Sequence, residues 1–317
     1  MSYGQSGFIG IGKEAIWGTP VAASDYIEAM SENLTLIIDR FDVKNIVGRL
    51  AEPDDMAGAQ RYPVDIVFPV HAIGIGHFLR SVFGQTSGSV VLSGFLWQTD
   101  FNFATADFVA ACAVPPYTFE VFRDVTSSHR YGGAVVNALK LSMAPNQDLR
   151  CTASIISKTS SIIAKSSASF PGSPVTPFAF DTVSLGIAGA GSSLIQALTI
   201  DLDNQLEGAL ALANTTEISR IRRRGPQLAK LSGTIAFDDM TEYNNFVNQT
   251  EQRFTASLFR AQSFQLTLDM PRVVYTAFPL GLSDRGQLLV NFEGKCRYHT
   301  GSLTAIKVSL TTVKSNY

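Results

Sequence analysis

The sequence predicts a mainly β protein built from two successive halves, each carrying one short helix. Three observations support this prediction. Alternating apolar and polar residues dominate the chain, helical spacing is confined to two segments, and the order of the predicted elements occurs twice. A chain of 317 residues is long enough for two ordinary domains or for one large β domain.

The predicted strands come from runs in which apolar and polar residues alternate. Successive side chains of a strand point to opposite faces, so this period of two is typical of half-buried strands. The clearest runs cover residues 33–39, 117–123, 136–143 and 264–270. We also expect a long last hairpin, with strands over 288–298 and 303–313 and a turn at 299–302.

Two segments have the spacing of an amphipathic helix. In residues 71–83 the apolar side chains recur at Ile75, Phe78, Leu79 and Val82. Residues 240–247 place Tyr243, Phe246 and Val247 on one face, with Asp239 as the expected N-cap and Glu242 three residues later.

The predicted organisation has four parts. Residues 157–193 are rich in Ser, Pro and Gly, and we interpret them as an irregular connector between the halves. The expected boundaries are an N-terminal arm at 1–28, a first domain at 29–158, the connector at 159–193 and a second domain at 194–317.

The internal repeat rests mainly on the order of elements. Strand, long loop, strand, helix, strands and terminal hairpin occur in both halves. The predicted matches are 33–39 with 197–203, 64–70 with 231–237, the strands after the helices at 90–101 and 254–260, and the Val-Asn pairs 136–137 and 290–291 that open the terminal hairpins.

Composition and motifs argue against several classes of function. The net charge is −2, so tight binding of phosphate is not expected. The widely spaced Cys112, Cys151 and Cys296 predict reduced, buried thiols rather than a metal site or a disulfide framework. The histidines lack metal-ligand spacing, and no nucleotide-binding or catalytic motif is complete, so we expect no cofactor, no metal and no enzyme. The N-terminus lacks the features of a signal peptide, and no stretch predicts a membrane span.

Several short motifs, taken in order, resemble the phage tail tube proteins of long, flexible-tailed phages. Near the start, Glu14 precedes the step Trp17-Gly18-Thr19-Pro20. A strand at 34–38, Gly48-Arg49 and a strand-to-helix step from 65–69 into 77–84 follow. The second half adds residues 223–225, 231–234, 237–239, Tyr243 and Phe246, and then 270–273 with Tyr275. The resemblance covers most of the chain except the connector, and the chain departs from the family in its length and its doubling.

The resemblance implies a fold and a role. The fold is two tandem tail-tube-type β-sandwich domains, each with a flanking helix, closing with other subunits into a ring that has a β-barrel lumen. The role is a structural virion protein, made in the bacterial host cytoplasm, whose rings stack into a tail channel for DNA. Ring closure removes exposed strand edges. Doubling implies a homotrimer with pseudo-sixfold symmetry in place of a homohexamer. The implied partners are the tape measure, terminator and baseplate proteins and the passing DNA, with no membrane.

Two sets of residues follow as candidate sites. Acidic or neutral residues suit a lumen through which DNA slides, and the candidates are Asp39, Asp42, Asp201, Asp203 and Glu207. An acidic loop at 50–61 and a basic loop at 214–226 occupy matching places and suit contacts between stacked rings. Those candidates are Trp17, Glu52, Asp54, Asp55, Arg220, Arg222, Arg223 and Arg224. The alternatives are outward-facing strand residues, solvated loops and an N-terminal arm folded back on its own domain.

Other functions remain open from the sequence. A tail terminator or baseplate ring protein would share the sandwich without polymerising. A carbohydrate-binding β-sandwich would need clustered aromatic residues, yet Trp17 and Trp97 lie far apart in the sequence. A β-rich hydrolase would need a paired acid and base, which the sequence does not show.

Overall fold

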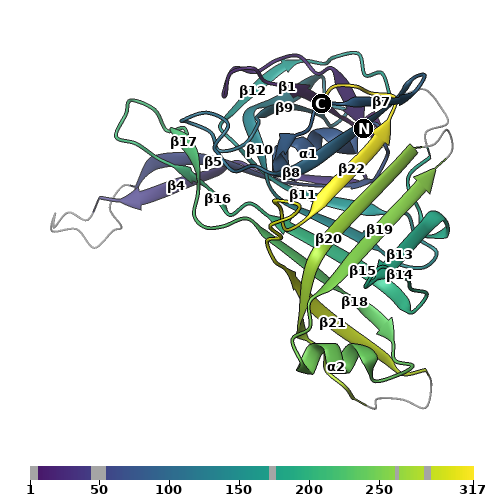
Figure 1. Cartoon of the computed structure of the whole chain (residues 1–317). Helices are drawn as coiled ribbons and strands as arrows, with labels where there is room; N and C mark the ends of the chain where they lie inside the picture. Colours follow the sequence, from purple (N-terminus) through teal and green to yellow (C-terminus); the bar gives the residue numbers. More distant parts are fainter. Residues whose placement is uncertain (1–5, 44–54, 171–175, 261–263, 282–286) are drawn as a thin grey trace.

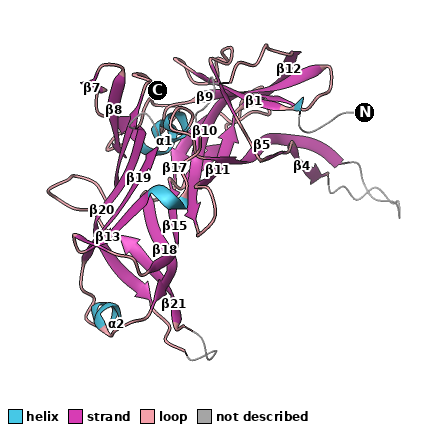
Figure 2. Ribbon diagram, turned by 90° about the vertical axis from the view of Figure 1, so that its right-hand side faces the viewer, coloured by secondary structure: helices cyan, strands magenta, loops and turns pink. Residues whose placement is uncertain are grey.

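The computed structural model describes residues 6–43, 55–170, 176–260, 264–281 and 287–317. It is mainly β, as the alternating patterns predict, and it contains two short α-helices (Figure 1). Helix α1 lies among the strands, whereas α2 lies at one end of the molecule (Figure 2).

The described part of the first half holds twelve strands and the larger helix. They are β1 (Phe8–Lys13), β2 (Asp25–Ile27), β3 (Ser31–Leu34), β4 (Ile37–Asp42), β5 (Asp55–Pro69), α1 (Ile75–Phe83), β6 (Gly84–Thr86), β7 (Val90–Ser93), β8 (Leu96–Phe103), β9 (Tyr117–Phe122), β10 (Ser127–Met143), β11 (Arg150–Ser157) and β12 (Thr159–Ala164).

The second half begins after a short 3-10 turn, η2 (Phe180–Thr182). Its elements are β13 (Val183–Ile187), β14 (Ala190–Gly191), β15 (Ile195–Asp203), β16 (Leu206–Ala209), β17 (Arg220–Arg223), β18 (Leu228–Ala236), α2 (Thr241–Val247), β19 (Gln252–Arg260), β20 (Phe264–Ala277), β21 (Leu289–Cys296) and β22 (Lys307–Thr312).

One antiparallel sheet runs through both halves. Its strands follow the order β3, β5, β11, β10, β15, β18, β21 and β20. At β20 the sheet branches toward β19 and β13 on one edge and toward β22 and β8 on the other. The pairings of the described strands branch without returning to close a ring, so the sheet of a single chain is open.

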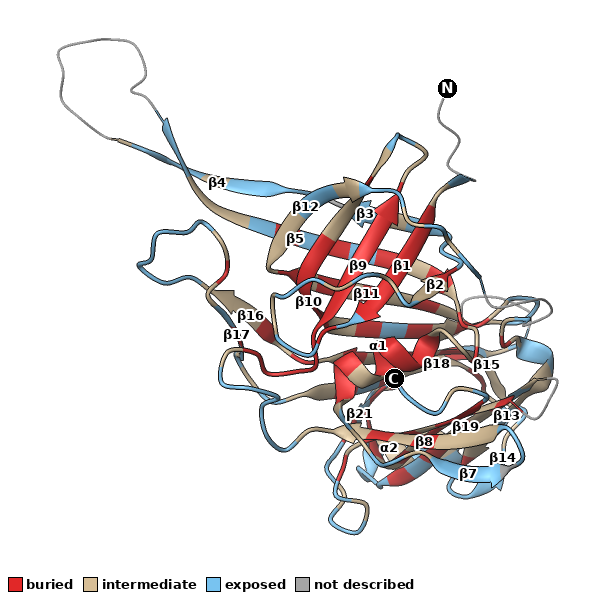
Figure 3. Ribbon diagram, turned by 90° about the horizontal axis from the view of Figure 1, so that it is seen from above, coloured by how far each residue is buried: buried red, intermediate tan, exposed pale blue. Residues whose placement is uncertain are grey.

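Strand β10 joins this sheet to a second one. Its first part pairs with β9 and β12, and its last part pairs with β11 and β15. The strand turns between sheets at Gly132-Gly133, where Gly133 has a φ of 63° that suits glycine. The second sheet continues from β9 to β1 and β2, and these central strands are mostly buried (Figure 3).

The same pattern of pairings occurs in both halves. Most strands of the first half have a counterpart in the second half that makes the same pairings. In order, β1, β2, β3, β4, β9, β10, β11 and β12 correspond to β13, β14, β15, β16, β19, β20, β21 and β22, and β5 corresponds to β17 and β18 together. Residues at matching register positions of these two sets are called equivalent.

Irregularities in the strands fix this register. The β10–β11 ladder shifts between Val136 and Ala138, and the β20–β21 ladder shifts between Tyr275 and Ala277. The β9–β10 ladder breaks after Tyr131, and the β19–β20 ladder breaks after Met270. The two irregularities within β10 are separated by the same number of residues as the two within β20. A single shift in residue number therefore aligns β10 with β20.

The helices are close to the predicted ones and occupy different environments. Helix α1 begins at Ile75 rather than at 71, and all its residues except Arg80 are buried. Helix α2 begins at Thr241, and none of its residues is fully buried. Asp239 contacts the start of α2, close to its predicted position as the N-cap. Its carboxylate accepts a hydrogen bond from the backbone N–H of Thr241 at 2.7 Å. Glu242 does not reach back to the helix start and instead accepts a bond from the Tyr275 hydroxyl at 2.7 Å.

The predicted last hairpin is wrong. Strands β21 and β22 form near the expected positions, but β21 pairs with β18 and β20, whereas β22 pairs with β20 and β8. The alignment of the chain ends is therefore also wrong, because Val136 lies on β10 and Val290 lies on β21. Alternation shows which residues form a strand, but it does not show which edge accepts that strand.

Three other local predictions need correction. The run at 33–39 is broken into β3 and β4. The connector contains β12, β13 and β14 rather than irregular chain throughout. The strand predicted after the first helix belongs to an insertion, β6 to β8, without a described counterpart between α2 and β19. Short Ser- and Gly-containing strands escape detection because they offer few large apolar residues.

A buried and a half-buried asparagine hold the join between β10 and β15. The Asn204 side chain donates to the Val136 carbonyl at 3.1 Å and accepts from the Gln227 amide at 2.7 Å. The Asn137 side chain accepts from the backbone N–H of Leu206 at 2.7 Å. Asn204 is fully buried, so each of these bonds replaces one that water would otherwise make.

We predict that Asn204→Ala destabilises the protein by about 1–3 kcal/mol, because it removes a hydrogen bond to the buried Val136 carbonyl and another from the half-buried Gln227 amide. Urea unfolding followed by circular dichroism measures the loss. Asn244→Ala on the exposed side of α2 is the matched control, and we expect it to change stability by less than about 0.5 kcal/mol. Equal effects of the two variants would contradict the proposed role of Asn204.

Candidate functional site: strand edges and protruding hairpins

The continuous sheet ends in two strand edges that the described residues leave unpaired. Strand β3 pairs with β5 on one side only. In β20, Val273 pairs with Gln252 on one edge and with Cys296 on the other. Beyond Val273 the edge that faced β19 has no described partner, although the equivalent edge of β10 pairs with β15. Unpaired edges of this kind are templates for another strand.

A pair of equivalent leucines shows what one edge lacks. Leu202 on β15 lies beside Leu139 of β10 and is 1% exposed. Its equivalent in the first half, Leu36, lies between β3 and β4 and is 51% exposed. The same side chain is therefore buried by a neighbouring strand in one half and bare in the other.

The bare region extends along the hairpin formed by β4 and β5. This hairpin projects from the body of the molecule (Figure 1) and is exposed over most of its length (Figure 3). Its exposed apolar side chains are Leu36, Ile37, Ile38, Phe41 and Met56. Apolar side chains gathered on a protruding segment mark an interaction surface. These residues are not among the candidate site residues predicted from the sequence, although the apolar run Leu36-Ile37-Ile38 is a signal that points to them.

The acidic candidates of this hairpin already have partners in their own chain. Asp39 pairs with Arg61, and Asp55 pairs with Arg40 at 2.7 Å. Asp55 begins a strand, so the predicted acidic loop is shorter than 50–61. Glu52 and Asp54 lie outside the described residues. Exposed pairs of this kind contribute little stability in water, so both carboxylates stay available to other partners.

The basic candidates lie on the hairpin of β16 and β17. Arg220 and Arg222 are exposed, Arg223 lies 3.5 Å from Asp107, and Arg224 lies 3.6 Å from Glu207. The two predicted loops meet within one chain, since the Gln60 N–H donates to the Thr216 carbonyl at 2.9 Å. A contact of these loops between stacked rings stays a prediction.

The five acidic lumen candidates separate into two places. Asp201 and Asp203 lie half-buried on β15 and alternate with the buried Ile200 and Leu202, so they share the polar face of the sheet. Asp201 stands in register between Lys140 and Lys230, which balances its charge locally. Asp39, Asp42 and Glu207 lie instead on the two hairpins. Whether either group lines a lumen stays a prediction.

Trp17 lies against its own chain. Its indole N–H donates to the Gly133 carbonyl at 3.0 Å, and the Lys158 ammonium lies 4.6 Å from the ring centre. Strand β1 pairs with β9, so the described part of the N-terminal arm folds back on its own half. A contact of Trp17 with another ring stays a prediction.

The motif around Trp17 has a structural explanation. Glu14 is fully buried, and its carboxylate accepts hydrogen bonds from the N–H groups of Gly18 and Gly133 and from the Thr118 hydroxyl, at 2.7–2.9 Å. Burial raises the pKa of Glu14, and these three donors oppose that rise. Gly18 has a φ of 78°, which explains a glycine after the tryptophan.

The titratable groups near the chain's end form a structural cluster. The carboxylate of Asp25 contacts His77 Nε2 at 3.1 Å and Lys314 Nζ at 2.5 Å. Burial alone would raise the pKa of Asp25, but the hydrogen bonds from His77 and Lys314 hold it well below its usual value. Burial lowers the pKa of His77, whose ring packs edge-on against Tyr117 and Tyr317. The cluster thus ties β2 and α1 to the last residues of the chain.

Among the described residues, no group of three or more His, Cys, Asp or Glu side chains is arranged to hold a metal ion. None of the described helices has the length and apolar character needed to span a bilayer.

We predict that this cluster makes stability depend on pH. Below a pH of about 6.5 the unfolded chain takes up a proton at His77 that the folded chain resists, so acidification favours unfolding. The contribution of Asp25 is present above a pH of about 4 and is lost on further acidification.

The variant His77→Gln should flatten the loss of stability between pH 6.5 and 5, where one such group changes stability by at most about 1.4 kcal/mol per pH unit. Urea unfolding at several pH values measures this slope. An unchanged slope in the variant would show that His77 is not responsible.

The sequence also matches a known family. A family model for phage tail tube proteins matches residues 4–295. A comparison with curated proteins finds no significant match. The family match covers most of the chain, including both free strand edges and both hairpins. The chain therefore belongs to the phage tail tube protein family, whose members are structural components of the virion tail rather than enzymes.

Proposed function

We propose that this protein is the major tail tube subunit, that three copies close into a ring with pseudo-sixfold symmetry, and that the rings stack into a channel for DNA. The contrast between Leu36 and Leu202 carries the proposal. The chain buries one of two equivalent leucines with its own strand β10, and a second copy would bury the other with β20.

The internal join supplies the geometry of the join between copies. Within the chain, Ala138 and Leu139 of β10 stand opposite Asp203 and Leu202 of β15. The equivalent residues are Ala277 and Phe278 at the end of β20, and Ile37 and Leu36. Continuing the sheet in the same register therefore sets Ala277 of one copy opposite Ile37 of the next. Each join satisfies backbone groups that an open edge leaves exposed.

The number of copies follows from the doubling. A ring that repeats one four-stranded unit six times needs three chains when each chain contains two such units. The units are β3, β5, β11, β10 and β15, β18, β21, β20. The contact is head to tail, and it forms a closed assembly only if the rotation per unit completes a circle.

The polar face of the continuous sheet suits the wall of a channel. One row of this face holds Lys140, Asp201, Lys230 and Lys295 on four neighbouring strands, so it carries both signs of charge, and the chain has a net charge of −2. A wall without strong positive charge would let DNA slide, because tight binding needs many lysines and arginines on the phosphates. Stacking would bring the two hairpins near the next ring, and the ends of the tube would meet the tape measure, terminator and baseplate proteins.

We predict that the concentrated protein forms rings of three chains and tubes, detected by native mass spectrometry and electron microscopy. Leu36→Asp should abolish rings and leave the monomer folded, because it places a charge in the buried join. Leu303→Asp is the control, since Leu303 is also an exposed leucine, lies on a turn and has a positive φ that Asp tolerates. A terminator or baseplate ring protein would give rings without tubes. A protein that stays monomeric at all concentrations would contradict the proposal.

We predict further that the double variant Ile37→Cys, Ala277→Cys forms disulfides between copies and yields a covalent trimer on a non-reducing gel. Opposed residues of neighbouring antiparallel strands lie within reach of such a bond. The native Cys112, Cys151 and Cys296 are buried and add little background. The control pair Ile38→Cys, Ala277→Cys is out of register by one residue and should not react. Reaction of the control pair alone would show a different register.

A further inference from the structure

Two hollows on the surface occupy equivalent places in the two halves. The first is lined by Val183, Leu185, Ile195, Gln196, Ala197 and Leu198 of β13 and β15, together with residues of the first half. The second is lined by the equivalents of these six, namely Gly7, Ile9, Ala29, Met30, Ser31 and Glu32, together with residues of β9. The strand pairings alone establish this equivalence, independently of the hollows.

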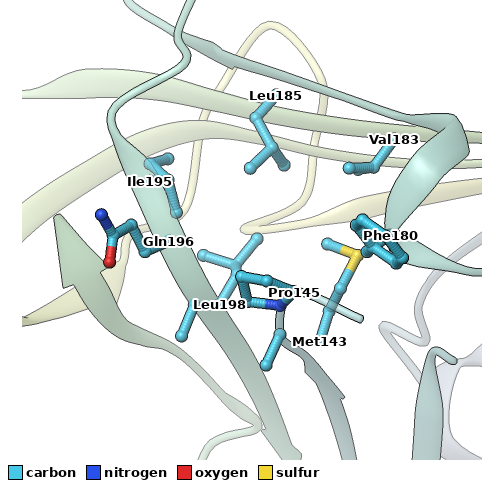
Figure 4. A pocket seen from close by; sticks show the side chains of 10 residues that line it. Met143, Pro145, Phe180, Val183, Leu185, Ile195, Gln196 and Leu198 are labelled. Atoms are coloured by element: carbon cyan, nitrogen blue, oxygen red, sulfur yellow. The ribbon is translucent and has the colours of Figure 1, made fainter. Parts of the chain in front are cut away.

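The chain fills the first hollow itself. Met143, Ala144 and Pro145 follow the end of β10 and enter it, and Phe180 closes one side. Figure 4 shows Met143 and Pro145 among Leu198, Ile195 and Val183. What remains is a volume of about 110 Å³, whereas the second hollow has about 370 Å³. No described residue fills the second hollow in this way, so it is the same seat without an occupant from the described part of the chain.

We propose that the hollow between β1, β3 and β9 is a seat for a second copy of this chain, which reaches it with the residues that follow β20. This inference rests on the proposed ring and adds a specific contact to it. In the internal join, Ser142 stands opposite Thr199, and Met143 stands opposite Leu198 at the mouth of the hollow. The equivalent of Ser142 is Gly281, which follows β20, so a neighbouring copy would meet the mouth of the seat at Gly281.

The empty seat is more polar than the filled one. Glu32 and Arg123 form a two-point ion pair at its edge, with Arg123 Nη2 at 2.9 Å from Glu32 Oε2. The equivalent positions in the filled seat hold Leu198 and Leu258, which are both buried. A charged pair at this place lets a free subunit expose the seat to water, whereas leucines would leave an apolar patch. The difference fits a seat that stays open until a neighbour arrives.

Site-specific photo-crosslinking tests the occupant directly. Met30 is exposed in the seat, and a benzoylphenylalanine placed there reports what lies within a few ångströms. Assembled protein would be irradiated, digested with trypsin and analysed by mass spectrometry. Mixing isotopically labelled and unlabelled chains separates links between copies from links within one. We expect the main product to join position 30 to the tryptic peptide 273–285 of another copy.

A second variant tests whether the seat must be empty before assembly. Ser31→Trp adds a large side chain to the open hollow and should reduce ring formation at least tenfold without lowering the stability of the monomer. Ser161→Trp, at an exposed position of β12 outside the hollow, is the matched control and should assemble normally.

The outcomes separate the two proposals. Rings that form normally with Ser31→Trp, or that link position 30 to a different surface, overturn the seat and leave the tail tube assignment intact. A chain that forms no rings under any condition overturns both. A link to peptide 273–285 within the same copy also overturns the seat, because that result needs no neighbour.

Discussion

The backbone groups at an open strand edge need hydrogen-bond partners, and most of the architecture of this molecule follows from which strand supplies them at each edge. Backbone N–H and C=O groups at the edge of a sheet stay unpaired unless water or another strand meets them. Strand β10 pairs with four neighbouring strands because it passes from one sheet to the other at Gly133. Strand β22 reaches back across the chain to β8, which closes another edge. The unpaired edges of β3 and β20 are the ones through which copies would join.

The repeated pairing pattern provides, within one chain, a copy of the join that we propose between subunits. The β10–β15 join within the chain has the geometry that a join between copies would repeat, with Leu202 buried where Leu36 is bare. The two joins differ in chemistry. The internal one is held by the half-buried Asn137 and the buried Asn204, whereas Ile38, the equivalent of Asn204, is apolar and exposed. A permanent contact can use buried hydrogen bonds, while a surface that forms later relies on apolar burial.

The charged groups divide into those that hold the fold and those on the surface. Glu14 is buried among three donors and fixes the turn at Gly18, and the Asp25, His77 and Lys314 cluster ties the end of the chain to β2 and α1. The arginine pairs on the two hairpins are exposed and contribute little to stability. The hairpins therefore present charge and apolar area to the outside without depending on either for folding.

The sequence by itself determined the β class, both helices to within a few residues and most strands, because these depend on local periodicity. The motif from Glu14 to Pro20 depends instead on tertiary contacts, because Glu14 and Trp17 form hydrogen bonds with the distant Thr118 and Gly133. Only the tertiary structure decided that β21 and β22 do not pair, that β12 to β14 interrupt the connector, and that the acidic and basic hairpins meet in one chain. Leu36 and Leu202 show the reason. Both read as strand residues, but the burial of a strand residue depends on which distant edge pairs beside it, and periodicity carries no information about that choice.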